Sequence, residues 1–86
     1  MKVLFSQNAD AELARTDSEL RRIFINHIEK IASMPPRRHM KYGVPCHVEN
    51  VTKQARIIYQ TEGENLHILH CFPNHKDYER WYNTYK

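Results

Sequence analysis

The sequence predicts a small α+β domain with the order β-α-α-β-β-β-α, in which a small antiparallel sheet packs on an N-terminal pair of helices. Three observations predict it. A capped apolar stripe of helical period occupies residues 17 to 33. Three β-prone segments with hairpin-length connections follow between residues 46 and 72. Aromatic residues then recur at helical spacing from about residue 75. We expect the 86 residues to form a single domain, 1–86.

Composition and charge narrow the class of protein. The chain is 41% hydrophobic and 27% charged, which is typical of globular proteins, and its formal net charge is +3. It lacks a long apolar run and a signal-peptide pattern, so we expect a cytoplasmic protein without a membrane segment. Residues 37 to 56 carry five basic side chains and Glu49 as their one acidic side chain. This local excess favours a polyanion such as RNA, although a solvated basic loop explains it equally well.

The first half of the chain contains one strand and two helices. Residues 2 to 5 alternate weakly and read as a strand, and the polar residues 6 to 10 can open a short helix to about Ala14. Thr16 and Glu19 have the spacing of a capping box, which predicts a helix that begins at Asp17. Its apolar stripe includes His27, which we expect to be a core or boundary residue. Pro35 and Pro36 end this helix near residue 33. The stripe consists of Leu20, Ile23, Phe24, His27, Ile28 and Ile31.

The second half is predicted to be an antiparallel meander followed by a helix. Residues 46 to 51, 55 to 60 and 66 to 72 are β-prone. The connections at 50 to 54 and 61 to 65, the second with Gly63, have the length of hairpin loops. Tyr78, Trp81, Tyr82 and Tyr85 have helical spacing, which predicts a helix from about residue 75 to 85.

Strand alternation predicts a polar surface in this meander. His47, Glu49 and Val51 share one face of their strand, which we expect to be the exposed face. Arg56 opens the next strand, within expected reach of Glu49. A histidine, a carboxylate and an arginine beside a basic loop can act on a phosphodiester. A surface salt bridge between Glu49 and Arg56 is the alternative interpretation.

The cysteines and the last strand raise the question of a metal site. His67 and His70 are separated by an odd number of residues, as are His70 and Cys71. In a regular strand each pair points to opposite faces, so we expect no metal ion to be bound there. Cys46 and Cys71 are expected to be small buried side chains rather than a disulfide framework.

Two short runs carry a family resemblance. The run His47-Val48-Glu49, followed by Arg56-Ile57-Ile58-Tyr59 in the next strand, resembles the RelE/ParE superfamily of toxins from toxin-antitoxin systems. The order of elements and the length agree over nearly the whole chain. The pattern is most similar to the YafQ, YoeB and RelE types, which implies a RelE-like fold.

The resemblance implies an mRNA interferase that needs neither metal nor cofactor. RelE-like members cut mRNA, most of them on the ribosome, through attack of the ribose 2′-OH on the adjacent phosphate, and so inhibit translation. It implies Arg56 as the cation that stabilises the phosphorane and His75 as the general acid. For the general base we favour Glu49, with His47 second, because a carboxylate beside Arg56 stays ionised and can accept a proton. This departs from RelE, where lysines stand at both positions. Tyr78 matches an aromatic residue that could stack on a base, although packing explains it equally well. Phosphate contacts are expected from Arg37, Arg38, Lys41 and Lys53.

Partners and alternatives also follow from the resemblance. Such toxins are held inactive by a cognate antitoxin, so we expect a toxin-antitoxin hetero-oligomer besides contacts with mRNA and the ribosome. A ParE-like toxin that inhibits DNA gyrase has the same scaffold and is a second interpretation. A non-catalytic relative that only binds an antitoxin is a third.

Overall fold

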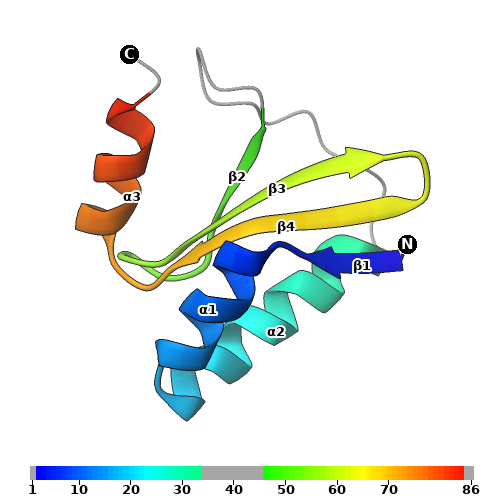
Figure 1. Cartoon of the computed structure of the whole chain (residues 1–86). Helices are drawn as coiled ribbons and strands as arrows, with labels where there is room; N and C mark the ends of the chain where they lie inside the picture. The colour runs from blue at the N-terminus through cyan, green and yellow to red at the C-terminus, as the bar shows by residue number, and fades with distance from the viewer. Residues whose placement is uncertain (1, 34–45, 85–86) are drawn as a thin grey trace.

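A four-stranded mixed sheet forms the centre of the computed structural model, which describes residues 2–33 and 46–84 (Figure 1). The sheet has the order β1-β4-β3-β2. The last three strands run antiparallel, which confirms the predicted meander. The first strand instead pairs in parallel with β4, because two helices rather than a hairpin connect it to the meander. The strands are β1 (Lys2–Phe5), β2 (His47–Asn50), β3 (Arg56–Glu62) and β4 (Asn65–Phe72).

Helices lie on both faces of this sheet. The pair α1 (Gln7–Arg15) and α2 (Ser18–Ser33) lies below it in Figure 1, and α3 (His75–Asn83) rises above its left end. We call the two sides the helix-pair face and the α3 face. None of the described helices is long and apolar enough to cross a membrane. The helix-pair core includes Leu13, Phe24, Ile28, Ile57, Leu66 and Ile68, and the α3 core consists of Cys46, Ile58, Phe72 and Tyr78.

The predicted capping box at Thr16 is wrong. The Thr16 hydroxyl donates to the Glu12 carbonyl at 2.8 Å, so it closes the end of α1 and is turned away from α2. Asp17 caps α2 instead, since its carboxylate accepts the Leu20 N–H at 2.9 Å. Consequently α2 begins at Ser18, one residue later than expected, and Pro35 and Pro36, which were expected to end it, lie outside the described residues.

The start of α1 replaces a strand partner along the exposed edge of β4. Strand β1 ends at Phe5, opposite Ile68. Beyond that point the Ser6 N–H donates to the Ile68 carbonyl at 2.9 Å, and the Ser6 hydroxyl donates to the Leu69 carbonyl at 2.6 Å. The Glu12 carboxylate then accepts the Cys71 N–H at 2.8 Å. These bonds fix α1 to β4 just before the chain enters α3, so they hold the α3 end of the sheet in place.

A bulge in β4 changes which side chains share a face. Ile58 pairs with His70 whereas the next residue, Tyr59, pairs with Ile68, so Leu69 is an extra residue. The prediction that His67 and His70 point to opposite faces is therefore wrong, and both lie on the α3 face. Among the residues that the structure describes, no group of three or more His, Cys, Asp or Glu side chains could hold a metal ion.

The two cysteines are free and buried, as predicted. They belong to different cores, Cys46 on the α3 face and Cys71 on the helix-pair face. Burial raises the pKa of both thiols, and that of Cys71 reaches about 12 because the charges of Glu12 and Asp10 add to the effect. Both side chains are therefore neutral thiols near pH 7.

Candidate functional site

Arg56 lies where the turn between β2 and β3 meets the base of α3. Its Nη1 donates to three backbone carbonyls of this turn, those of Thr52, Lys53 and Ala55, at 3.1, 3.2 and 2.9 Å. Its guanidinium carbon lies 5.8 Å from the centre of the Tyr78 ring. The turn and the Tyr78 ring together hold the positive charge of Arg56 on the α3 face of the sheet.

His75 is the first residue of α3 and lies beside the same ring. Its ring centre is 5.7 Å from that of Tyr78, and its backbone N–H donates to Oε1 of Gln54 at 3.3 Å. Within the described part of the chain, its Nδ1 is enclosed without a hydrogen-bond partner. Its Nε2 lies 3.5 Å from Oε1 of Glu79, one helical turn later. The side chains of His75 and Glu79 are 43% and 60% exposed, so Nε2 is the nitrogen that can meet a ligand.

Tyr78 is a buried residue whose ring contacts both Arg56 and His75. Its ring also packs near Phe72, at 6.5 Å, and near Tyr82, at 6.0 Å. Burial raises the pKa of the Tyr78 phenol, as does the neighbouring Tyr82, whereas the charge of Arg56 lowers it. The phenol is therefore neutral near pH 7. Because Tyr78 is only 5% exposed, little of its ring is available to stack on an RNA base, and its role is to hold Arg56 and His75 in position.

Glu49 and His47 lie on the other side of the sheet. Arg56 stands opposite Asn50 in the register, and Glu49 stands opposite Ile57. Opposite residues of an antiparallel pair share a face, so Glu49 points toward the helix pair and away from Arg56. Glu49 and Arg56 therefore do not form the contact that was expected between them.

Both side chains meet residues of the helix-pair face instead. Oε2 of Glu49 lies 4.0 Å from Nδ1 of the half-buried His27, which is a boundary residue as predicted. The His47 ring stacks on Tyr59, with centres 5.0 Å apart and an interplanar angle of 19°. The face that carries His47 and Glu49 was predicted to be exposed, but the helix pair leaves both residues half-buried.

The predicted RNA contacts are described only at Lys53. This exposed residue lies in the turn that holds Arg56. Arg37, Arg38 and Lys41 lie outside the described residues. Sequence reasoning missed Glu79, whose spacing of four residues from His75 on a helix was the available signal.

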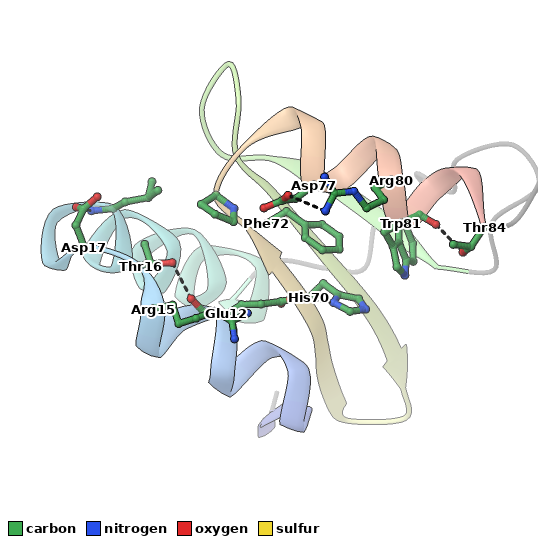
Figure 2. Close-up of a pocket in the computed structure, with 12 residues that line it drawn as sticks. Glu12, Arg15, Thr16, Asp17, His70, Phe72, Asp77, Arg80, Trp81 and Thr84 are labelled. Carbon is green, nitrogen blue, oxygen red and sulfur yellow. Dashed lines mark hydrogen bonds and ion pairs between the residues drawn. The ribbon is translucent and has the colours of Figure 1, made fainter.

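A groove lies on the flank of α3 that faces α1 (Figure 2). It has a volume of about 580 Å³. At its floor Nδ1 of His70 lies 2.9 Å from Oε2 of Glu12, and the His70 ring lies 5.6 Å from that of Trp81. Figure 2 shows Asp77 and Arg80 joined on the α3 wall, where their charged atoms are 3.9 Å apart. The groove lining combines acidic and basic side chains, so its charge does not favour a polyanion as the Arg56 site does.

Comparison with known proteins identifies the fold. No protein-family model matches the sequence, and no curated protein matches it. Solved structures do match. A YoeB/ParE toxin from Agrobacterium tumefaciens superposes with a TM-score of 0.71 and 17% identity, over 84% of this chain and 96% of that one. The isolated E. coli RelE toxin gives 0.71 and 14%, over 96% of each chain. The chain has the fold of the RelE/ParE toxin superfamily.

A third match includes a partner protein. The chain covers 94% of a chain from a heterotetrameric YoeB-YefM toxin-antitoxin complex of Staphylococcus aureus, with 84% of its own length, a TM-score of 0.64 and 11% identity. These structures confirm the RelE-like fold that the two short runs around Glu49 and Arg56 predicted. Within this RelE-like fold, Arg56 opens β3, an inner strand of the sheet, beside the start of α3.

Proposed function

We propose that this chain is the toxin of a type II toxin-antitoxin system and that it cleaves mRNA on the ribosome, in the cytoplasm, as an endoribonuclease. The observation that carries the proposal is the meeting of Arg56, His75 and Tyr78 at the base of α3. The RelE-like fold supports it, because RelE and YoeB toxins share this scaffold.

The proposed reaction uses the RNA as its own nucleophile. The ribose 2′-oxygen attacks the adjacent phosphorus, the bond to the 5′-oxygen breaks, and a 2′,3′-cyclic phosphate results. Arg56 stabilises the negative charge on the phosphorane oxygens, since its planar guanidinium suits phosphate geometry. His75 donates a proton from Nε2 to the leaving 5′-oxygen. Lys53 contacts a neighbouring phosphate, as do Arg37, Arg38 and Lys41 of the basic segment.

For the base that takes the 2′-OH proton, we propose Glu79. Its carboxylate lies next to Nε2 of His75, one turn further along α3, and its side chain is 60% exposed. Glu49 and His47, the bases that the family pattern suggests, would have to act from the helix-pair face. Glu49→Gln is therefore a matched control for Glu79→Gln, since both changes remove one charge and keep the shape of the side chain.

The experiment incubates the protein with translating ribosomes and a defined mRNA, with the same mRNA alone in parallel, and maps the cleaved ends. We expect 2′,3′-cyclic phosphate ends, and a loss of about 100-fold or more in rate for Arg56→Ala and His75→Ala, which should keep the native circular dichroism spectrum. Glu79→Gln should lose activity and Glu49→Gln should not. Normal cleavage by both Arg56→Ala and His75→Ala would place the active site elsewhere.

We also propose a cognate antitoxin as partner, as in the YoeB-YefM complex. Within the described residues, β1 and β2 are the outer strands of the sheet, so their outer edges can receive an added segment. Expression of the chain alone should stop bacterial growth, and co-expression with the product of a neighbouring short reading frame should restore it. The two proteins should then elute together as a hetero-oligomer in size-exclusion chromatography. Restored growth without a complex would contradict direct binding.

A gyrase-inhibiting toxin is the second candidate, because the A. tumefaciens structure is described as a YoeB/ParE toxin. A supercoiling assay with purified gyrase separates the two functions. Inhibited supercoiling with intact mRNA would favour the ParE-like function, and no effect in either assay would favour a relative that only binds its antitoxin.

A further inference from the structure

A second pocket lies on the α3 face, at the end of the sheet far from α3. The α3 helix packs over Phe72 and Ile58 through Tyr78, Trp81 and Tyr82, and the hairpin end of β3 and β4 extends beyond it (Figure 1). The pocket has a volume of about 490 Å³. Its described lining consists of Cys46, His47, Gln60, Thr61, Glu62, His67 and Leu69, so His47 at the start of β2 also borders it. The mechanism proposed above gives these residues no role.

The pocket shares its face with Arg56. Arg56, Ile58 and Gln60 alternate along β3, so all three point to the α3 side. Gln60 stands directly opposite His67, and the bulge at Leu69 keeps that apolar side chain on the same face. Gln60 lies four residues along β3 from Arg56, about 13 Å away, and the aromatic side chains of α3 lie over Ile58 between them.

The chemistry of the lining suits a flat, uncharged ligand with hydrogen-bonding edges. Leu69 and the Cys46 thiol, which burial keeps neutral, provide an apolar floor. Gln60 and His67 provide side-chain donors and acceptors on the α3 face, and Glu62 provides an acceptor that carries a negative charge. The described lining contains no lysine or arginine, so it disfavours a phosphate. A nucleobase has the properties that this lining requires.

We propose that this pocket binds one base of the RNA whose phosphate Arg56 contacts, beyond the part of the face that α3 covers, and that it selects a base with an exocyclic amino group. The inference rests on the proposed function, because it names a subsite of the same RNA. Glu62 accepts hydrogen bonds from the amino group, and guanine is the best ligand because it places two adjacent N–H donors toward one carboxylate. Uracil lacks such an amino group and binds most weakly.

The first arm of the test measures cleavage preference. An mRNA library with all four bases around the cleavage site is cut by the wild type and by two variants, Glu62→Gln and His67→Leu. We expect the wild type to disfavour uracil at one position by on the order of tenfold, and both variants to lose this preference. Glu64→Gln, in the same hairpin but outside the pocket, is the matched control and should cut like the wild type.

The second arm measures binding without cleavage. RNA tetranucleotides with 2′-O-methyl groups, which cannot react, are titrated while the NMR signals of Gln60 and His67 are followed. Oligonucleotides that contain guanine should shift these signals, and oligouridine should shift them far less. Glu62→Gln should remove the difference.

The two arms separate the possible failures. Selective shifts at Gln60 and His67 without any cleavage would support the pocket and overturn the proposed nuclease. Cleavage with unchanged preference in Glu62→Gln and His67→Leu, or tetranucleotides that leave Gln60 and His67 unshifted, would overturn the pocket alone. Neither cleavage nor binding would overturn both.

Discussion

Glu12 is the residue whose replacement tests the packing of α1 on β4 most directly. Its carboxylate accepts the Cys71 N–H at 2.8 Å and lies 2.9 Å from Nδ1 of His70. The side chains of Glu12 and His70 are only 14% and 17% exposed, so water replaces these bonds poorly. Hydrogen bonds to a charged group contribute about 1.5 to 3 kcal/mol each, and a buried amide without a partner costs about 1 to 3 kcal/mol.

We expect Glu12→Ala to lower the free energy of unfolding by about 3 kcal/mol, since the two bonds share one carboxylate and do not add fully. A domain of 86 residues has a total stability of roughly 4 to 13 kcal/mol, so this loss would be between about a quarter and three quarters of the total. Glu12→Gln should lose only about 1 kcal/mol, because its amide oxygen can still accept the Cys71 N–H.

Urea unfolding followed by circular dichroism measures these differences. Glu29→Ala, an exposed glutamate on α2, is the matched control and should change the free energy by less than about 0.5 kcal/mol. If Glu12→Ala matched Glu29→Ala, the carboxylate would not be what joins α1 to β4. The Cys71 N–H on the edge of β4 would then not need the Glu12 carboxylate as its partner.

Three further outcomes follow from the structure. Cys71 has a folded pKa of about 12 against an ordinary value of 9.0, so the unfolded thiol ionises first. Its contribution to stability is complete below about pH 9 and is lost as the pH rises toward 12, by at most about 1.4 kcal/mol per pH unit. Urea unfolding at pH 7, 9 and 10 should show a smaller loss in Cys71→Ala, and equal slopes would contradict the burial effect. Asp17→Ala should cost about 1 kcal/mol as a lost helix cap, which the midpoint of urea unfolding measures; an unchanged midpoint would reject this cap. A double-mutant cycle of Glu49→Ala and Arg56→Ala should give a coupling energy near zero, because the two side chains leave opposite faces, and a clear coupling would refute that assignment.

Local patterns predicted the elements well. The apolar stripe from Leu20 to Ile31 identified α2, and the hairpin spacings identified the meander, because each pattern reflects a face buried by its own element. The residues at which α1 ends and α2 begins depended instead on contacts between the two helices. The hydroxyl of Thr16 had two possible partners, and the carbonyl of Glu12 in the preceding helix was the one it bonded. The spacing of a capping motif does not show whether a second group, here the Glu12 carbonyl, will bind the same hydroxyl.

The candidate site was predicted less completely because strand register is a nonlocal property. Arg56 and His75 were identified from the sequence, and the structure places both beside Tyr78. Glu49 was expected beside Arg56, but the turn pairs Arg56 with Asn50, and a shift of one residue sends a side chain to the opposite face. The bulge at Leu69 has the same effect on His70. No proline or glycine marks the Arg56–Asn50 register or the bulge at Leu69, so neither could be predicted from the sequence.

The position of α3 explains why the two proposed subsites lie at opposite ends of one face. The aromatic side chains of α3 fill the middle of that face, over Ile58 and Phe72. This leaves the positively charged end at Arg56 and an end without a basic residue in its described lining at Gln60, Glu62 and His67. An RNA strand needs both kinds of contact, because phosphate contacts hold the backbone in place and base contacts supply selectivity. Changes at Arg56 should therefore affect every substrate alike, whereas changes at His67 should affect substrates according to their bases.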